Sequence, residues 1–482
     1  MTFDLPMTAL LKKNWFVFLL LALLIGVVYA NSLPNSFVTD DEGIVKEGKN
    51  WLTWGRILMD PESGRFSAAP LRTLVYSFTY LLADLQPWAY RLGNLFFHLG
   101  TTFLAFLVVK RLVNSKVALL SSVIFAVHPA ISEAVAWISG GGYIQYSFFF
   151  LLSFYLYLNS KNSKLQYYLS IFFFGTALLT LNRALVLVAL FPIYEYCFGD
   201  LKKNWKRTLP FLILSSLSLL TFFTAVGVRA TKLEAIYYKD GYFYNPLLQW
   251  PQAIGSYLSL LFWPQHLTYV HTNTQTPLVY SFRLLILLGY FAALSYTFLK
   301  KRKLFFWLAL FLIPLLPTLT PLKIAFVVAE RYSYLGSLGI IVLFSMGVFS
   351  LLKIKELKFL VLALVSLGIV SLGVRTMFRN TDWKDPKTLW ERTSEVSQDS
   401  SQAHLNNGVR LAKEGNFTEA EKEFIAAIQI NPKIGEYYYN LGVLYLKTGH
   451  KDQAREYFQK AVELKPNYPD AQKGLDLLNK SP

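Results

Sequence analysis

The sequence predicts an all-α membrane protein, in which about eleven membrane-spanning helices precede a short solenoid of paired helices. Three observations predict this fold class. Hydrophobic residues make up 54% of the 482 residues and charged residues only 16%, whereas a soluble globular chain is about 45–50% apolar and about 25% charged. Within residues 1–380, basic residues gather in short loops between apolar runs, which is typical of membrane topology. The remainder repeats with a period of 34 residues, a spacing typical of stacked helix pairs.

The charge balance separates a membrane protein from a nucleic-acid-binding one. Residues 1–380 hold 33 of the 47 basic but only 15 of the 30 acidic residues. A basic soluble domain would favour a nucleic-acid partner. Here the basic residues flank apolar runs, so we expect the lipid bilayer as the partner and no nucleic acid. The single Cys197 excludes a disulfide framework and a cysteine-based zinc site.

Eleven apolar runs approach the roughly 20 residues that cross the hydrocarbon core. They cover 14–31, 91–109, 117–130, 143–158, 165–181, 184–199, 209–227, 283–299, 304–320, 335–352 and 359–375. The run 248–263 is short and ends at Pro264, which favours a re-entrant or interfacial helix.

The orientation of the chain in the membrane follows from its basic loops. If 248–263 does not cross, the clusters near residues 12, 110, 161, 202, 300 and 353 all lie on one side, which the positive-inside rule assigns to the cytoplasm. The N-terminus is then cytoplasmic and the C-terminal tail external. The expected location is a bacterial inner membrane with the tail in the periplasm, or an endoplasmic reticulum membrane with a lumenal tail in a eukaryote. The first run lacks a small-residue cleavage site and is interpreted as a retained helix.

The tail, residues 381–482, contains two copies of a 34-residue unit, 400–433 and 434–467. The copies align at Gly408/Gly442, Gly415/Gly449, Ala420/Ala454, Phe424/Phe458, Ala427/Ala461 and Pro432/Pro466. This is the pattern of tetratricopeptide (TPR) repeats. An incomplete leading repeat is expected at 386–397 and a capping helix at 469–480. Because about three repeats are needed for independent stability, we expect the array to lean on the membrane domain or on a partner.

Candidate chemistry begins in the first external loop, at about 32–90, which is too long for a simple connection. Its apolar residues recur at helical spacing from Trp51 to Leu58 and again from Leu71 to Leu81, which indicates helices lying in the membrane interface. Asp40 and Asp41 directly follow the first apolar run, where a carboxylate could act as a general base beside a lipid-borne substrate. The alternative is a solvated acidic cluster that caps the next helix.

Other candidates are ionisable residues near the expected external ends of the runs, because such residues are often functional at membrane depth. They are Arg72, Arg91, His128, Glu133, Arg183, Glu330 and Arg331. Each of these residues could instead have a purely structural role. Glu330 and Arg331, for example, could pair with each other or extend toward the membrane interface.

Five segments together carry a family resemblance. They are 37–41 (FVTDD), 70–74 (PLRTL), 90–98 (YRLGNLFFH), 125–140 (FAVHPAISEAVAWISG) and 330–339 (ERYSYLGSLG). With the TPR tail, they resemble the transmembrane-and-TPR O-mannosyltransferases, which are part of the GT-C superfamily of polyprenyl-phosphate-sugar-dependent glycosyltransferases. The resemblance covers nearly the whole chain in order. It implies a GT-C-type transmembrane domain over residues 1–380 and a TPR domain over 381–482.

The resemblance also implies roles for the acidic pair. The family's catalytic aspartate lies in the first external loop, four residues before an aliphatic or aromatic residue. That residue matches Ile44, which implies that Asp40 is the catalytic aspartate and that Asp41 is its acidic neighbour. The other candidates named above would then bind the donor phosphate or the substrate.

Three positions depart from the family pattern. Ala69 replaces an arginine, 141–143 replaces an Arg-x-Asp, and 182–183 reads Asn-Arg in place of Lys-Glu. No cofactor is certain from the sequence: a divalent metal stays open as an alternative, but the missing aspartate disfavours it. The altered positions also suggest a different sugar or acceptor.

The resulting hypothesis is a membrane glycosyltransferase. It would move a sugar, by resemblance a mannose-like hexose, from a polyprenyl-phosphate donor to an acceptor hydroxyl on the external or lumenal side. The implied acceptor is Ser or Thr of a protein held by the TPR domain. A single displacement inverts the anomeric centre, whereas retention usually needs a carboxylate nucleophile. The alternative is a catalytically decayed, membrane-anchored TPR scaffold for envelope assembly.

Overall fold

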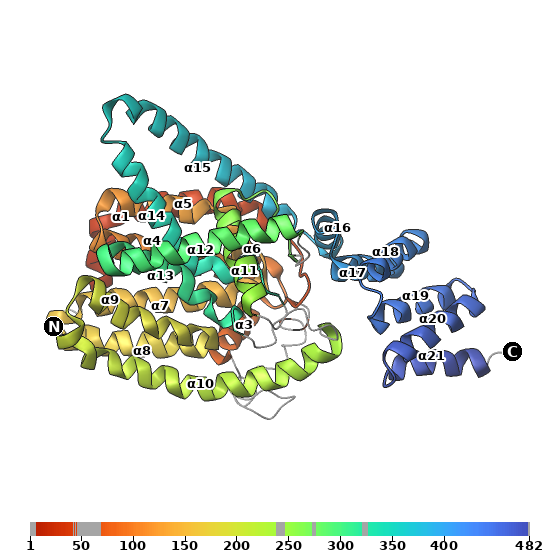
Figure 1. Ribbon diagram of the computed structural model, residues 1–482. Helices are drawn as coiled ribbons and strands as arrows, with labels where there is room; N and C mark the ends of the chain where they lie inside the picture. The colour runs from red at the N-terminus through yellow and green to blue at the C-terminus, as the bar shows by residue number, and fades with distance from the viewer. Residues whose placement is uncertain are drawn as a thin grey trace.

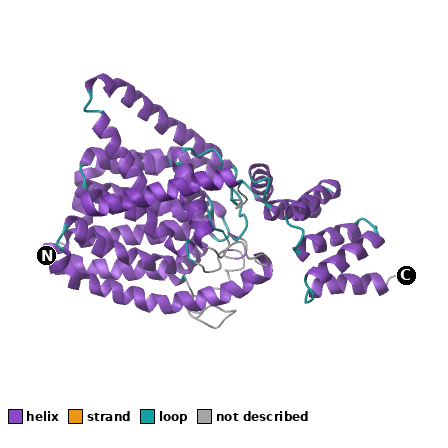
Figure 2. Ribbon diagram, in the orientation of Figure 1, coloured by secondary structure: helices purple, strands orange, loops and turns teal. Residues whose placement is uncertain are grey.

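The computed structural model describes residues 6–41, 43, 45, 69–237, 246–271, 276–320 and 326–480, and Figure 2 shows that its regular elements there are helices. The first half of the membrane domain contains α1 (Pro6–Tyr29), α3 (Pro70–Ala83), α4 (Pro87–Leu112), α5 (Ser115–Val127), α6 (Ser132–Ala136), α7 (Gly141–Asn159), α8 (Lys164–Thr180), the 3₁₀ segment η7 (Asn182–Ala189) and α9 (Leu190–Phe198). The second half contains α10 (Leu201–Tyr237), α11 (Pro246–Phe262), α12 (Pro277–Lys300), α13 (Arg302–Leu312), η8 (Ile313–Thr318), η9 (Glu330–Ser333), α14 (Tyr334–Leu351) and α15 (Lys358–Thr381).

The multi-pass character predicted from the sequence is confirmed. In the described part of the chain, five helices are long and apolar enough to cross a membrane, or six if the bent pair Ser115–Val127 and Pro129–Ala136 forms one span. The five are Asn14–Ser32, Pro87–Leu112, Pro277–Lys300, Glu330–Leu351 and Lys355–Thr381. Each of the eleven apolar runs coincides with a helical segment. That all eleven of them cross the membrane stays a prediction.

Proline and asparagine side chains fix the ends of several helices. Pro87 begins α4, where its missing N–H would have no intrahelical partner in any case. Asn114 caps α5 by accepting a hydrogen bond from the backbone N–H of Val117 at 2.9 Å. Between α5 and α6 the chain bends by 62° at Pro129, which cannot continue the helical hydrogen bonding. This bend directs α6 along the end of the bundle.

The bundle has two chemically different ends. At one end, here called the basic pole, Lys110 at the end of α4 donates to Asn14 at 2.7 Å, and the end of α9 meets the end of α12 through Tyr196 and Phe298. Figure 1 shows the C-terminal helices attached at the opposite end, here called the TPR pole. The most basic loops and the candidate site residues therefore lie at opposite ends.

The first external loop is described in part. Helix α3 (Pro70–Ala83) confirms the helical spacing predicted from Leu71 to Leu81. The other predicted interfacial stretch, near Trp51–Leu58, lies outside the described residues, as do Glu42 and Ile44. The short run 248–263 forms α11, whose inner face is buried against α12 and α13.

Three asparagines join the first span to the last. Asn31 donates to the carbonyl of Met377 at 2.7 Å, and Asn35 donates to the carbonyl of Asn380 at 2.9 Å. Asn380 in turn donates to the carbonyl of Val28 at 2.9 Å. Residues about 350 positions apart in the chain thus hold the beginning of the first external loop against α15.

The C-terminal helices form the predicted TPR array. They are α16 (Pro386–Val396), α17 (Ser401–Lys413), α18 (Phe417–Ile430), α19 (Gly435–Lys447), α20 (Lys451–Leu464) and α21 (Pro469–Lys480). A Cβ on Gly442 would lie 2.8 Å from the ring of Phe458, so the paired helices approach too closely for a side chain there. Gly449 has φ of +83°, which favours glycine. Gly408 and Gly415, one period earlier, have the same two roles.

The TPR array contacts the membrane domain, one of the two arrangements expected from its small number of repeats. Ser397 donates to the carbonyl of Val270 at 2.7 Å, and its hydroxyl lies 3.0 Å from that of Thr268. The backbone N–H of Ser36 donates to the carbonyl of Lys384 at 2.7 Å. Helix α16 is therefore fixed to two loops of the TPR pole.

Candidate active site at the TPR pole

Asp40 and Asp41 are adjacent but lie in different environments. The Asp41 side chain is fully buried and accepts hydrogen bonds from the backbone N–H groups of Val38, at 3.1 Å, and Ser139, at 2.9 Å. The Ser139 hydroxyl also donates to it at 2.5 Å. Asp40 is exposed. Asp41 therefore ties the first external loop to the segment after α6, while Asp40 is accessible to a substrate.

Burial raises the pKa of Asp41 to about 6, although its hydrogen bonds and the nearby Arg91 act in the opposite direction. Arg91 is itself buried and donates to three backbone carbonyls. These belong to Ala136, at 2.9 Å, and to Asn35 and Ser36. With these bonds made, Arg91 positions the Asp41 loop and has little capacity left for a phosphate.

The buried Glu133 on α6 pairs with Arg331 on η9. Its Oε2 accepts from the backbone N–H of Arg331 at 2.7 Å, and its Oε1 contacts the Arg331 guanidinium. Arg331 does not pair with its neighbour Glu330, so that structural alternative is wrong. Consecutive residues on a helical turn do not face each other.

Glu330 points instead toward the last span and the loop after α11. Its Oε1 accepts from Arg379 Nη2 at 3.1 Å and from the backbone N–H of Thr268 at 2.8 Å. Arg379 also donates to Asp382 at 2.9 Å. Glu330 therefore joins α15 to the loop that contacts α16, and it fixes the backbone beside Arg331.

Aromatic rings surround the Arg331 guanidinium. Its Cζ lies 5.1 Å from the Trp137 ring centroid, 5.0 Å from that of Tyr332 and 5.5 Å from that of Phe326. Tyr269 lies slightly farther away, at 6.0 Å. Such cation–π contacts strengthen when they are removed from water, and they hold the charge of Arg331 in one place.

A second guanidinium uses the same tyrosine. Arg183 Cζ lies 4.3 Å from the Tyr332 ring centroid and 5.8 Å from that of Tyr143. In the described part of the chain, Arg183 has no carboxylate within ion-pair distance. Arg183 and Arg331 thus bring two positive charges to one ring, and only Glu133 faces them in an ion pair.

The remaining predicted residues lie around this centre. Arg72 on α3 is half-buried, packs with its Cδ against Gly142, and its Nε lacks a hydrogen-bond partner among the described residues. His128 is buried and has backbone partners on both ring nitrogens: Ala130 N–H donates to Nδ1 at 3.1 Å, and Nε2 lies 2.9 Å from the carbonyl of Leu261. His128 therefore stabilises the bend between α5 and α6.

The departure at 141–143 has a packing reason. Asn94 contacts the backbone at Gly141 so closely that a Cβ there would collide with its amide. The same amide donates to the carbonyls of Trp137, at 3.2 Å, and of Val135, at 3.3 Å. The glycines let α4 approach the segment after α6, and Tyr143 then packs against Tyr332 with a centroid distance of 5.7 Å.

Among the described residues, no group of three or more His, Cys, Asp or Glu side chains lies close enough to hold a metal ion. Carboxylates, guanidinium groups and aromatic rings gather at the TPR pole.

Sequence reasoning missed four residues of this centre: Trp137, Tyr269, Tyr332 and Arg379. Trp137 and Tyr332 lie inside the quoted motifs, but aromatic residues are common throughout this chain and gave no distinct signal. Arg379, at the end of the last span, could have been found as an ionisable residue near membrane depth. Tyr269 lies in a short loop without any pattern.

Comparisons with known proteins agree with this arrangement. Residues 435–468 match the tetratricopeptide repeat family. Protein O-mannosyl-transferase TMTC3 of Homo sapiens is 27% identical over 488 residues, which cover 87% of this chain and 53% of that protein. Protein O-mannosyl-transferase TMTC4 of Homo sapiens is 26% identical over 475 residues, covering 82% and 63% respectively.

The chain is thus similar in sequence to the transmembrane-and-TPR O-mannosyltransferases. The resemblance stated from the motifs is thereby confirmed, and so is the combination of a helical membrane domain with a TPR array. The chain spans about half the length of TMTC3.

Solved structures with partial likeness include two other membrane proteins. Archaeal oligosaccharyltransferase AglB from Archaeoglobus fulgidus, in complex with an inhibitory peptide and a dolichol-phosphate, has a TM-score of 0.49 at 12% identity over 82% of this chain and 60% of that one. ArnT from Cupriavidus metallidurans bound to undecaprenyl phosphate has a TM-score of 0.42 at 13% identity, covering 93% and 80%. The functional argument below rests on the O-mannosyltransferase relatives and on the geometry of the site.

Proposed function

We propose that this protein is a membrane glycosyltransferase that moves a sugar from a polyprenyl-phosphate donor to a hydroxyl group of a protein acceptor. The observation that carries the proposal is the pair of guanidinium groups, Arg183 and Arg331, on the single ring of Tyr332. They lie at the same pole as a loop with one exposed and one buried aspartate. The relatives' names, protein O-mannosyl-transferase, support mannose as the sugar.

The two arginines suit the donor phosphate. As the bond between the sugar and the phosphate breaks, negative charge grows on the phosphate, and fixed positive charges stabilise it where it develops. Arginine remains charged at any physiological pH and binds phosphate through two parallel hydrogen bonds. The donor's lipid would remain in the bilayer beside the helices, which explains why the site lies at the end of a membrane bundle.

Asp40 is the proposed general base. The acceptor oxygen attacks the anomeric carbon, the carbon–oxygen bond to the phosphate breaks, and polyprenyl phosphate leaves with the bonding electrons. The acceptor's proton passes to the Asp40 carboxylate. This single displacement inverts the anomeric centre. Asp41 is already saturated by Val38 and Ser139, so it serves as the support of the loop.

Tyr269 connects these two halves of the proposed site. Its ring lies 6.0 Å from the Arg331 guanidinium, and burial together with the charge of Asp40 raises the pKa of its hydroxyl above the usual range. A neutral, buried tyrosine is therefore close to both the exposed carboxylate and the fixed guanidinium.

The decisive experiment compares Asp40→Asn with a matched control. Polyprenyl-phosphate mannose labelled in the sugar is the donor, and a Ser/Thr-containing peptide is the acceptor. A positioned general base contributes about a hundred- to ten-thousand-fold, so Asp40→Asn should lose transfer to that extent while it still binds donor. Asp84→Asn is the control, because Asp84 is also exposed at the TPR pole and its φ of +51° is tolerated by asparagine.

Asp41→Asn completes the set and should reduce transfer less than Asp40→Asn. If Asp41→Asn is inactive and Asp40→Asn is active, the base is Asp41. Full activity in both variants contradicts the carboxylate mechanism. A wild-type protein that binds neither donor nor peptide favours the scaffold alternative.

A further inference from the structure

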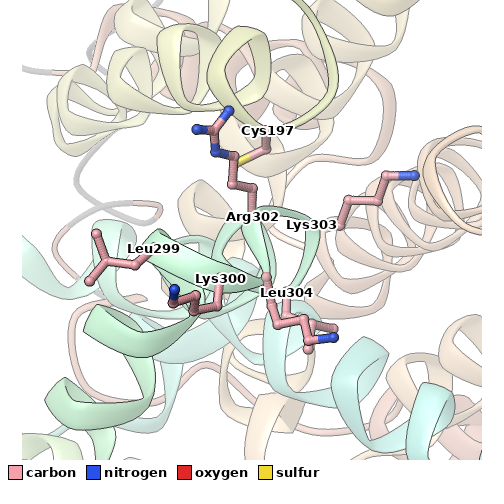
Figure 3. A pocket seen from close by; sticks show the side chains of 7 residues that line it. Cys197, Leu299, Lys300, Arg302, Lys303 and Leu304 are labelled. Carbon is pink, nitrogen blue, oxygen red and sulfur yellow. The ribbon is translucent and has the colours of Figure 1, made fainter.

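A hollow of about 540 Å³ lies at the basic pole, opposite the candidate active site. It is lined by Cys197 at the end of α9 and by residues 299–304, which form the turn from α12 to α13. Figure 3 shows Arg302 extending toward Cys197, with Lys300 and Leu299 on the other side of the turn. The lining combines four basic side chains with apolar ones.

The positive charge of this hollow is not neutralised nearby. None of its four basic residues forms an ion pair with another described residue. Two acidic groups lie close in sequence to Cys197, but both are engaged. Glu195 is buried and accepts from Tyr157 and Asn204, each at 2.7 Å, and Asp200 lies 3.7 Å from Lys203. The hollow therefore offers its charge to a ligand.

Aromatic contacts hold one of the cations in position. The Arg302 guanidinium lies 4.5 Å from the Tyr196 ring centroid. Tyr196 stacks on Phe298 with a centroid distance of 5.0 Å, and its hydroxyl donates to the Phe298 carbonyl at 3.1 Å. A planar guanidinium fixed in this way is suited to binding a phosphate through two hydrogen bonds.

An exposed apolar face leads away from the hollow along α12. Its residues recur every three or four positions apart from one gap of eight between Leu288 and Tyr296, which is about two turns, so they share one side of the helix: Leu278, Phe282, Leu285, Leu288, Tyr296 and Leu299. A helix of 24 residues is about 36 Å long at 1.5 Å per residue, comparable with the hydrocarbon core of about 30 Å. A ligand with both a phosphate and long acyl chains matches this combination, and a free phosphate does not.

We propose that the hollow is a binding site for the headgroup of an anionic phospholipid whose acyl chains lie along the exposed face of α12. The inference is independent of the glycosyltransferase proposal, since it concerns the opposite pole. Basic pockets between transmembrane helices bind anionic headgroups in this way. Such a lipid would bridge α9 and the α12–α13 turn, which also meet there through Tyr196 and through the contact of Phe198 with Phe306.

The test uses the full-length protein in detergent micelles doped with either phosphatidylglycerol or zwitterionic phosphatidylcholine. The number of bound lipids is measured by native mass spectrometry. Each basic residue near an anionic lipid surface contributes about fivefold in affinity. Neutralising Lys300, Lys301, Arg302 and Lys303 to glutamine together should therefore lower the preference for phosphatidylglycerol by at least about tenfold. A far-UV circular dichroism spectrum and a thermal midpoint like those of the wild type show that the variant is folded, without relying on the proposed transfer activity.

The matched control neutralises the basic turn between α14 and α15, where Glu356 lies among Lys353, Lys355 and Lys358. Converting these three lysines to glutamine should change the preference by less than about twofold. Arg302→Lys keeps the charge but loses the planar fork, so an intermediate loss of about fivefold is expected. Equal losses in both clusters would overturn the proposal, because they indicate general attraction. Displacement of phosphatidylglycerol by inorganic phosphate would also overturn it, as a free-phosphate site.

Discussion

Tyr332 shares its ring between guanidinium groups from two distant segments, and Arg331 is the more firmly held of the two. Arg331 contacts Glu133 through both its backbone N–H and its side chain. Lysine would retain the positive charge but could not reproduce the planar fork that faces Glu133 and a phosphate at once. We predict that Arg331→Lys raises the donor concentration required and lowers turnover.

The expected loss in kcat/KM is about ten- to a hundredfold, since a hydrogen bond to a charged group contributes about 1.5–3 kcal/mol. Steady-state kinetics with labelled polyprenyl-phosphate mannose would measure it. Wild-type kinetics in the lysine variant would assign Arg331 to a purely structural role as the partner of Glu133.

Asp41 gives a prediction about pH. Burial raises its pKa to about 6 in the folded protein, against about 3.9 in an unfolded chain. The folded protein therefore binds this proton more tightly, so the contribution of Asp41 to stability is greatest below about pH 4 and is lost as the pH rises through about 6.

As the pH rises from about 4 to about 7, the thermal midpoint of the wild type should consequently decrease relative to that of Asp41→Asn. Differential scanning fluorimetry of both proteins across this range measures the difference. A difference that stays constant with pH contradicts a titrating buried carboxylate.

At the level of single residues, the sequence indicated which residue types to consider but said less about which residues they contact. It singled out the aspartate pair, Glu133 and Arg331 as candidates, because ionisable residues near membrane depth are often functional, and their roles stay predictions. It could not show that Glu330 pairs with Arg379, because that contact joins residues 49 positions apart. Adjacent opposite charges suggested a local pair that the helical turn of η9 does not allow.

Among the structural elements, the short helix α16 connects the TPR array to the candidate site. Trp383, just before it, is fully buried and stacks on Trp137 with a centroid distance of 5.8 Å and an interplanar angle of 17°. Trp383 also meets Tyr269 edge-on at 5.7 Å. Because Trp137 and Tyr269 both contact Arg331, we expect a movement of α16 to displace the rings around this guanidinium.

We predict that Trp383→Ala reduces transfer to a peptide acceptor more than it reduces hydrolysis of the donor by water. Removing a buried tryptophan costs about 3–5 kcal/mol, and the cavity would loosen α16 while leaving most of the bundle intact. Both rates are measured on the same preparation. Trp205→Ala is the control, since Trp205 is half-exposed on α10. Equal loss of both activities in Trp383→Ala would mean that the junction only stabilises the fold.

Sequence patterns predicted these elements well where the pattern is local. Apolar runs became helices, and the 34-residue period became helix pairs because the small residues recur where the paired helices touch. The junction was beyond prediction, because Trp137, Tyr269 and Trp383 come from three separate segments. Their contact depends on the bend at Pro129 and on how α15 ends.

For the whole molecule, the separation of the basic pole from the TPR pole predicts orientation. The positive-inside rule places the basic loops in the cytoplasm, so the TPR array and the candidate site should face the external or lumenal side. A reporter that is active only in the cytoplasm, fused after Pro482, should stay silent. The same reporter fused after Lys301, in the basic loop, should be active. A signal from the C-terminal fusion would reverse the proposed topology.

The asparagine contacts between the first and last spans also have a consequence for biosynthesis. Asn35 and Asn31 follow α1 directly, yet their partners at the end of α15 leave the ribosome about 350 residues later. At about 5–20 residues per second, this delay is roughly 20–70 s. During that time the segment bearing Asp40 lacks its contacts with α15, although its contacts with Arg91 and Ser139 can already form. A nascent chain that stops before α15 would therefore have the start of its first external loop held on the α4 and α6 side only, with the three asparagine contacts to the last span still missing.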